Sequence, residues 1–357
     1  MSRKSKQERK QKKQMQIIIA IAAAVLIGLA ALLIGAAANS EEFGEHDHDH
    51  NGTSQAKLKI AVAFEESNPH YESILKFKSE VEEKSGGSIS VGIYGSGKLG
   101  NDKDLVNSIK DKENKVDIVV TSVENFTDVD PRMDISTLPF IFSSYEDAVA
   151  FVEGDVQESI EVGLQKKNIR ILSHYSDGFE YITSIGQMIM KATDVKNMSF
   201  AVDKGSDMAA VMSKLGAIVH PVEAEAIPHV VGSGVYNGYI GSLDTIMSGN
   251  LYSSQKNLAV TYHRYNALAF AISEEAWNSL TESEQKIVLT AAEESAHQDR
   301  SKEKETAENT LKRLEANGMK ITYPNLLSFV REVESYIISL KSKYGDLIND
   351  VIENMNE

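Results

Sequence analysis

The sequence predicts an α/β fold with open, mainly parallel sheets, and three observations support this class. Short apolar segments alternate with amphipathic segments of helical period along most of the chain. Glycine, asparagine and serine separate these segments, as expected for turns and helix caps. A length of 357 residues with 42% hydrophobic side chains can bury more than one core, so we expect more than one lobe.

The elements follow one another in the order expected for βαβ units. The expected strands occupy residues 57–64, 88–94, 116–122, 169–175 and 198–202. The expected helices occupy residues 70–85, 102–110, 144–155 and 205–216. The capping box Thr281-Glu282-Ser283-Glu284 predicts the start of a long charged helix that continues to about Leu314.

The N-terminal region predicts a membrane segment before this body. Residues 17–38 are 22 consecutive small or apolar residues, which span roughly 33 Å as a helix and can cross a hydrocarbon core of about 30 Å. The basic tail of residues 1–16 is expected to stay in the cytosol, which places everything after Ala38 outside it. Two interpretations remain, an uncleaved transmembrane anchor and a signal peptide cleaved after Ala38; the length of the apolar segment favours the anchor.

Charge and cysteine content exclude several function classes. Residues 1–38 hold seven of the 37 basic residues but one of the 52 acidic residues, so the rest of the chain has a net charge of −21. A body this acidic repels phosphate backbones, and nucleic acid is therefore not an expected partner. The absence of cysteine excludes disulfides, thiolate metal sites and thiol catalysis.

Residues 39–56 are polar and aperiodic and are expected to form a flexible tether. His46, His48 and His50 alternate there with aspartates, so they are candidate ligands for a loosely held divalent metal. A solvated linker without a metal is the simpler interpretation. The chain contains neither H-E-x-x-H nor G-x-S-x-G, and we expect a protein without catalytic activity or cofactor.

Gly95, Gly97 and Gly100 match the dinucleotide pattern G-x-G-x-x-G, and the same stretch resembles a phosphate-binding loop. Leu99 stands where such a loop needs Ser or Thr to hold Mg²⁺. The following strand also ends without the acid that a dinucleotide site requires. The glycines therefore predict a tight turn before a helix that is capped by Asn101.

Four segments in order resemble substrate-binding subunits of tripartite ATP-independent periplasmic (TRAP) transporters, the DctP-like family. The first is "LKFKSEVEEKSGGSISVGIYGSGKLGNDKDLV", which resembles the opening of these subunits. The second is "DISTLPFIFSSYEDAVAFVEG" and the third is "GVYNGYIGSLDTIMSGNLYSSQKNLAVTYH". The fourth, "AISEEAWNSLTESEQKIVLTAAEESA", completes a series that covers most of the body.

The resemblance implies a two-lobed clamshell with the periplasmic-binding-protein-like fold and a long bridging helix after Thr281. The first lobe would comprise residues 57–177 and about 266–305, and the second lobe residues 178–265 and about 306–357. An extracytoplasmic solute-binding protein of this kind closes over a small solute and docks on an integral-membrane permease driven by an ion gradient. A sensor that passes the same binding event to a signalling partner is the alternative.

Three positions depart from the family pattern. Family members that bind carboxylates have an arginine where this chain has Glu180 and a second arginine where it has Ala201. The ligand-facing asparagine of D-G-x-E-N is replaced by Gly241. Each charge-assisted hydrogen bond contributes about 1.5–3 kcal/mol, so we expect a ligand other than a typical C4-dicarboxylate.

Three interpretations of this altered site remain open. In the first, the ligand is neutral or cationic, Glu180 accepts from it, and Tyr236 and Tyr239 offer their rings. In the second, another base reaches the site and binds an acid; the candidates are Lys204, Arg132 and Arg264. In the third, Glu180 points to solvent. Two further candidate ligand-binding residues are Asn237, which belongs to the altered motif, and Glu225.

Overall fold

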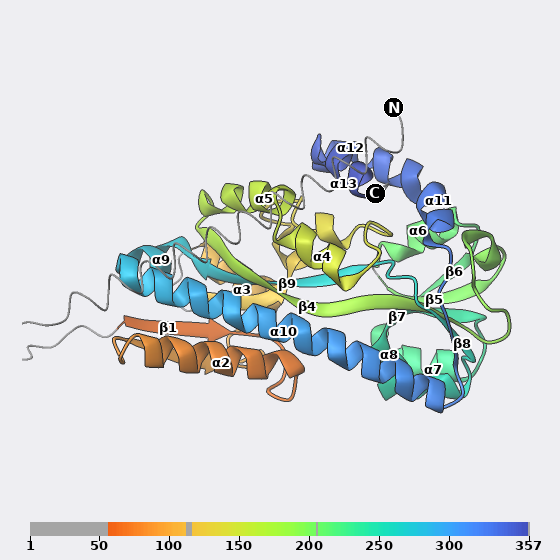
Figure 1. Cartoon of the computed structure of the whole chain (residues 1–357), viewed down its shortest axis with the longest axis horizontal. Helices are drawn as coiled ribbons and strands as arrows, with labels where there is room; N and C mark the ends of the chain where they lie inside the picture. Colours follow the sequence, from red (N-terminus) through yellow and green to blue (C-terminus); the bar gives the residue numbers. More distant parts are fainter. Residues whose placement is uncertain (1–55, 112–115, 205, 356–357) are drawn as a thin grey trace, which may run out of the picture. The chain divides into compact units, whose positions relative to one another are not determined.

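A computed structural model describes residues 56–111, 116–204 and 206–355 (Figure 1). The expected basic tail, the apolar segment of residues 17–38 and the tether with His46, His48 and His50 lie outside the described residues. Among the helices of the described part, none has both the length and the apolar composition needed to cross a membrane.

Ten strands form one continuous sheet path through both lobes, in the order β2-β1-β3-β9-β4-β7-β5-β6, with β8 beside β4 and β10 beside β8. Their bounds are β1 Ala56–Ala61, β2 Ile89–Tyr94, β3 Ile118–Ser122, β4 Ile169–Ser184, β5 Ser199–Asp203, β6 Ile218–Val222, β7 Gly238–Ser242, β8 Asn257–Ala259, β9 Tyr265–Ser273 and β10 Lys320–Thr322.

Helices cover the strands on both sides of the sheet path (Figure 1). The α-helices are α2 Pro69–Lys84, α3 Asp102–Lys110, α4 Tyr145–Val152, α5 Asp155–Gln165, α6 Met208–Lys214, α7 Ile227–Gly232, α8 Leu243–Ser248, α9 Glu274–Ser279, α10 Glu282–Ala316, α11 Leu326–Ser339, α12 Lys341–Tyr344 and α13 Leu347–Met355. The 3-10 helices are η1 Val123–Phe126, η2 Ile135–Thr137, η3 Ala192–Val195, η4 Ala224–Ala226 and η5 Leu251–Ser253.

Two lobes share the long strand β4, and the sheet is mixed instead of mainly parallel. The first lobe contains β1, β2, β3 and β9, and the second contains β5, β6, β7, β8 and β10. β1 pairs in parallel with β2 and β3, and β5 pairs in parallel with β6 and β7. β4 and β9 cross between the lobes and pair antiparallel with each other, because one carries the chain from the first lobe to the second and the other carries it back.

Local sequence signals account for the helix starts. The Asn101 side chain and Asp104 form a reciprocal capping box at α3, and Thr281 and Glu284 form another at α10. Both predicted starts are confirmed. Gly97 and Gly100 of the G-x-G-x-x-G stretch have φ values of +62° and +132°, so the pattern serves a tight turn that non-glycine residues rarely adopt.

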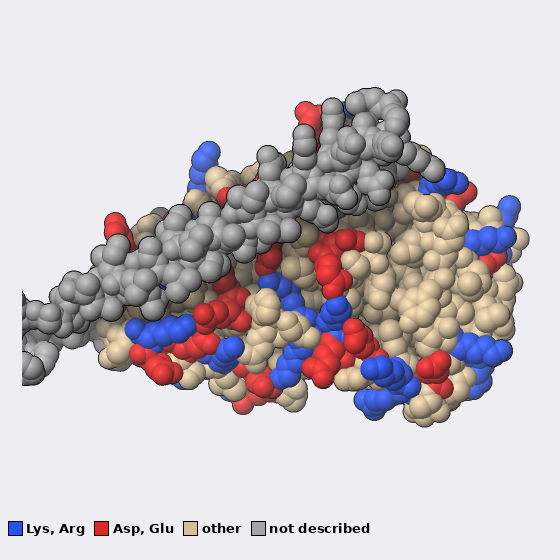
Figure 2. Space-filling view, in the orientation of Figure 1, with Lys and Arg blue, Asp and Glu red and all other residues tan. Residues whose placement is uncertain are grey.

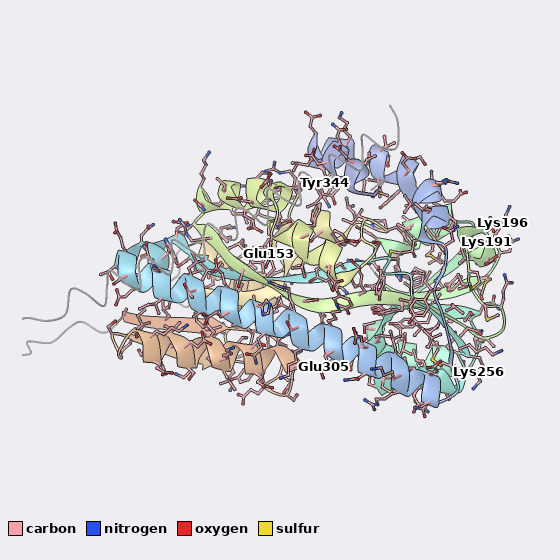
Figure 3. All side chains as sticks on the ribbon, in the orientation of Figure 1. Glu153, Lys191, Lys196, Lys256, Glu305 and Tyr344 are labelled. Carbon is pink, nitrogen blue, oxygen red and sulfur yellow. The ribbon has the colours of Figure 1, made fainter. Side chains whose placement is uncertain are left out.

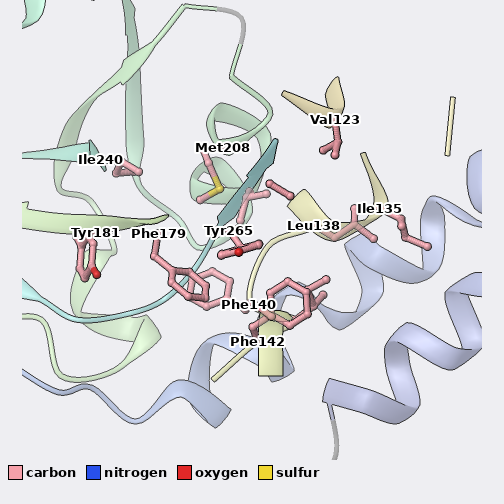
Figure 4. Close-up of a cluster of buried hydrophobic side chains, with 14 of the residues drawn as sticks. Val123, Ile135, Leu138, Phe140, Phe142, Phe179, Tyr181, Met208, Ile240 and Tyr265 are labelled. Carbon is pink, nitrogen blue, oxygen red and sulfur yellow. The ribbon is translucent and has the colours of Figure 1, made fainter. Parts of the chain in front are cut away.

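Two apolar clusters form the core. One lies between α2, the first half of α10 and one face of the sheet of the first lobe. The other continues from the opposite face into the second lobe. Figure 4 shows part of it, in which Tyr265 lies beside Phe142 and Phe179. The buried aromatic side chains therefore join the two lobes.

The strand β4 is bulged where it passes between the lobes. Its pairing with β9 shifts register between Ser176 and Phe179, and Gly178 adopts a φ of +73°. His70 at the start of α2 lies beside this bulge, with Nδ1 2.9 Å from Asp299 Oδ2 of α10 and Nε2 3.4 Å from Asp177 Oδ1. The bulge is thus connected to α2 and to α10 by one imidazole.

Candidate functional site

The carboxyl ends of three strands meet at one edge of the sheet in the second lobe. β5 lies between β6 and β7 and is parallel to both, so the three strands end together at Asp203, Val222 and Ser242. In open α/β sheets, ligands bind in the crevice at this carboxyl edge. We therefore take this edge as the candidate ligand site.

Arg264 lies near this edge between two carboxylates. Its Nη1 is 3.2 Å from Glu180 Oε1 on β4, and its Nη2 donates to Glu124 of η1 in the first lobe. The Glu180 backbone N–H donates to the Arg264 carbonyl at 3.0 Å. The Arg264 and Glu180 side chains are 11% and 14% exposed, so water screens this ion pair little, whereas the Glu124 side chain is more exposed. Arg264 thereby connects the first lobe to the strand that crosses between the lobes.

Glu180 is held as a charged partner of this guanidinium and does not point to solvent. Burial raises the pKa of its carboxyl, but His263 and Arg264 outweigh burial and hold that pKa below its ordinary value. His263 Nε2 lies 3.7 Å from Glu180 Oε2, and His263 Nδ1 contacts Thr261 Oγ1 at 2.7 Å. Glu180 is therefore fixed in place by two side chains from the segment before β9.

Asp203 ends β5 with a carboxyl oxygen that lacks a donor. Its Oδ1 is buried and accepts no hydrogen bond from the described residues. Burial raises the pKa of Asp203, and the charge of nearby Glu180 raises it further. A buried acceptor without a donor is costly, so a donor group of a ligand would find an unoccupied partner here.

Tyr239 fills the space beside Gly241. A Cβ atom placed on Gly241 would lie 2.0 Å from the Tyr239 hydroxyl oxygen, so the tyrosine occupies the place of a side chain at position 241. The Tyr239 side chain is buried, which raises its pKa, and the charge of Asp203 contributes to that shift. Where the family pattern has a ligand-facing asparagine, this chain has Gly241, and the phenol ring of Tyr239 occupies the space beside it.

The structure separates the remaining predicted site residues. Tyr236 and Asn237 precede β7 and lie at the opposite end of these strands, where Asn237 Oδ1 accepts from the Ser199 N–H at 2.8 Å. Ala201 is fully buried in the core. Glu225 is exposed in η4, after the end of β6, and so lies at the carboxyl edge. Of the predicted residues, Glu180, Tyr239, Gly241 and Glu225 lie toward that edge.

Among the three bases considered as replacements, Arg264 is the one beside Glu180. Arg132 makes two hydrogen bonds to Asp130, of 2.9 and 2.8 Å. Lys204 follows Asp203 at the edge, where its exposed side chain pairs with Glu223 at 2.5 Å. Neither of these two interacts with Glu180 in the described structure.

Three carboxylates of the site were missed from the sequence, Glu124, Asp203 and Asp207. Glu124 lies two residues after β3 and Asp203 ends β5, and an acidic residue near the carboxyl end of an apolar strand is the signal that could have identified both. With Glu180 and Asp207, whose charge also acts on Arg264, four carboxyl groups stand around one guanidinium. The described residues contain no group of three or more side chains suited to hold a metal ion.

A separate cavity of about 970 Å³ lies between α4, α5, β4 and α10. Polar and charged side chains of its lining lie in pairs, His174 with Glu161, Arg300 with Glu153 and Lys304 with Glu146. Because each of these side chains already lies beside an opposite or titratable partner, the pairs do not identify a ligand. The strand edge remains the better candidate.

Comparisons with known proteins agree with this architecture. The chain is 24% identical over 281 residues to the sialic acid-binding periplasmic protein SiaP of Vibrio cholerae, covering 78% of this chain and 86% of SiaP. It is 22% identical over 229 residues to the C4-dicarboxylate-binding protein DctB of Bacillus subtilis, covering 64% of this chain and 65% of DctB. A TRAP periplasmic solute-binding protein from Ochrobactrum anthropi has a similar fold, with a TM-score of 0.79 and 22% identity over 85% of this chain and 96% of that one.

The two lobes and the strand-edge site define a binding protein for small solutes. Residues 60–342 match the family model described as DctP, bacterial extracellular solute-binding protein, family 7. The chain belongs to this family and is a DctP-like substrate-binding protein of the TRAP type, as the four sequence segments predict.

Proposed function

We propose that this protein binds a small solute outside the cytoplasm and delivers it to a TRAP permease driven by an ion gradient. Family membership supports this role, because substrate-binding proteins of this type serve such permeases. The two-lobed architecture suits the task, since closure of the lobes over a solute would remove it from water and present a ligand-dependent surface. The strand edge with Asp203, Glu180 and Arg264 is the proposed site of the solute.

The proposed solute is neutral or cationic. The observation that carries this proposal is the engagement of Arg264 by both Glu180 and Glu124, while the Asp203 carboxyl oxygen has no donor. A carboxylate ligand would have to displace one of the two partners of Arg264 and then lie close to the others. A hydroxyl or ammonium group would instead donate to Asp203.

The relatives give a contrast in ligand chemistry. DctB and SiaP are named for acids, a C4-dicarboxylate and sialic acid. The arginines that the family resemblance assigns to acid binding are replaced here by Glu180 and Ala201. Losing two charge-assisted contacts lowers affinity by roughly 3–6 kcal/mol, so we propose that this chain binds such acids weakly.

A titration of the full chain with ligands of matched length tests the charge preference. Succinate and 1,4-diaminobutane have the same number of carbons and opposite charge, and a neutral polyol completes the series. We expect the amine or the polyol to raise the melting temperature, because a ligand at 100 times its Kd stabilises the native state by about 2.7 kcal/mol. Succinate is expected to produce no shift.

Asp203→Asn is expected to weaken amine binding by about 10- to 150-fold, the equivalent of a charged hydrogen bond of roughly 1.5–3 kcal/mol. Asp128→Asn, at an exposed pair with Lys103, is the matched control and leaves affinity unchanged. Binding of succinate that disappears in Arg264→Gln would contradict the proposal, because Arg264 would then hold an acid.

A further inference from the structure

One surface of the second lobe is basic, although the chain as a whole is acidic. Three segments form it, residues 185–198 after β4, 249–262 around β8 and 316–331 around β10. They contain five basic residues and one acidic residue, Asp194, in a chain with 37 basic and 52 acidic residues. The basic residues are Lys191, Lys196, Lys256, Lys320 and Arg331.

Among the residues that the structure describes, these positive charges have no acidic partner. All five side chains are exposed, and none pairs with a carboxylate within the part of the chain that the structure describes. The one acidic side chain, Asp194, binds backbone instead of a lysine: its Oδ2 accepts hydrogen bonds from the N–H groups of Met190 and Lys191. Lys256 Nζ donates to the Ser253 carbonyl at 2.7 Å.

Large apolar side chains are exposed among these lysines. Met188, Met190, Tyr323 and Leu327 are between 45% and 68% exposed. Figure 2 shows this end of the protein as mainly uncharged with basic side chains at its rim, whereas basic and acidic side chains are mixed over α2 and α10. Figure 3 places Lys191, Lys196 and Lys256 around that end. We call the four apolar side chains and the five basic ones the basic apolar surface.

Backbone hydrogen bonds hold the three segments together as one surface. The Asn325 N–H donates to the Met190 carbonyl at 2.8 Å, and the Lys320 N–H donates to the Lys256 carbonyl at 2.9 Å. β8 pairs with both β4 and β10. The backbone that carries these exposed side chains is therefore held in place before a partner binds.

We propose that the basic apolar surface rests on an anionic membrane surface. Lysine ammonium groups pair with lipid phosphates, and methionine, leucine and tyrosine side chains enter the boundary between headgroups and acyl chains. The acidic remainder of the body is repelled by the same lipids, so charge alone would orient the protein with this surface toward the bilayer.

A second copy of this chain is a poorer occupant for the same reason. A twofold contact would place each surface against itself, and the five unpaired cations of one copy would face those of the other. The four exposed apolar side chains alone would favour self-association. Repulsion between the basic side chains of the two copies opposes it. The lipid surface offers the opposite charge.

Single-cysteine labelling of the full chain in vesicles tests the proposal, because the sequence contains no other cysteine. Leu327→Cys on the surface and Val162→Cys on α5 are matched in exposure, 56% and 49%. Each variant carries an environment-sensitive fluorophore and is mixed with phosphatidylcholine vesicles with or without phosphatidylglycerol. We expect an emission shift at position 327 with phosphatidylglycerol alone, and none at position 162.

The shift should disappear in about 1 M salt, where the Debye length falls to about 3 Å. Lys256→Gln with Lys320→Gln should reduce the ratio of docked to free label about 25-fold, or fivefold per lysine, with an unchanged melting temperature. Equal shifts at both positions, or equal shifts in the two kinds of vesicle, would overturn the proposal. A shift that requires the permease in the vesicle would also overturn it and would assign the surface to that protein.

Discussion

The candidate site and the bulge of β4 each place a buried cation between two carboxyl groups from distant parts of the chain. At the site, Arg264 lies between Glu180 and Glu124. At the bulge, His70 lies between Asp299 and Asp177. The two clusters have the same sign pattern but different chemistry, because guanidinium stays charged at all ordinary pH values and imidazole does not.

We therefore expect the stability of the bulge, more than that of the candidate site, to depend on pH. Burial lowers the pKa of His70, but hydrogen bonds to Asp177 and Asp299 more than compensate and raise it from 6.5 to about 10. Burial and the charge of Asp177 raise the pKa of nearby Glu303 from 4.5 to about 8. At the site, the Arg264–Glu180 ion pair does not depend on pH in the ordinary range. At the bulge, His70 and Glu303 change their charge with pH.

His70→Ala is expected to have the largest effect on stability. The substitution leaves Asp299 buried without its main partner, which costs about 3–5 kcal/mol in the free energy of unfolding at pH 7. The folded pKa of His70 lies above its unfolded value, so its contribution is complete below pH 6.5 and is lost as the pH rises through about 10. Urea unfolding at several pH values measures this.

The difference between wild type and His70→Ala should therefore shrink progressively from about pH 6.5 and be small near pH 10. His297→Ala, at an exposed histidine on α10, serves as the control and should leave stability unchanged at each pH. A difference that stays constant from pH 6 to pH 10 would show that the imidazole does not act through its charge.

Arg264→Gln is expected to lower the free energy of unfolding by about 2–4 kcal/mol, because Glu180 remains in a site that is largely closed to water. This loss should be the same at every pH from 6 to 10, since arginine does not titrate there. Arg313→Gln, at an exposed position on α10, is the matched control. A loss that follows pH in the way expected for His70 would remove the contrast between the two clusters.

Gly241→Ala is expected to cost about 1–3 kcal/mol, because the added methyl group meets the Tyr239 hydroxyl. The same substitution in a Tyr239→Ala background should cost much less, since the obstructing ring is gone. Thermal unfolding of the two single variants and the double variant gives this coupling. Additive effects would mean that the tyrosine does not fill the space beside position 241.

Glu303→Gln is expected to stabilise the protein by about 1–2 kcal/mol at pH 8. The folded pKa of Glu303 is raised, so the wild-type protein loses stability as the pH rises from about 4.5 to about 8, and the amide avoids that loss. No gain is expected at pH 4. Glu305→Gln, at an exposed position on the same helix, is the control. An equal gain in stability in both variants would show that the raised pKa of Glu303 is not the cause.

Local patterns allowed much of the fold to be predicted. The capping boxes at Asn101 and Thr281 each involve side chains three residues apart, so a short window of sequence contains the whole interaction. The segment expected as a strand at residues 169–175 is the first half of β4, which continues to Ser184. Its second half was missed because Ser176, Asp177 and Gly178 resemble a strand end.

The candidate site was only partly predictable, because its contacts join distant residues. The resemblance identified position 180 as unusual, but Arg264 is 84 residues away and Glu124 is 140 residues from Arg264. The periodicity of apolar residues in the sequence does not indicate ion pairs between residues so far apart. Tyr236 and Asn237 were expected beside the ligand from their motif, yet strand direction places them at the opposite end of β7.

The helix α10 crosses the molecule without interruption over 35 residues, a length of about 52 Å. It packs on α2 in the first lobe and on α8 and β10 in the second, and Asp299 and Glu303 lie near its middle. A bend of about 10° there would carry either end through roughly 4–5 Å, given a half-length of about 26 Å. Because Asp299 contacts both His70 and the Ser176 N–H of β4, the middle of α10 is anchored where the chain passes between the lobes.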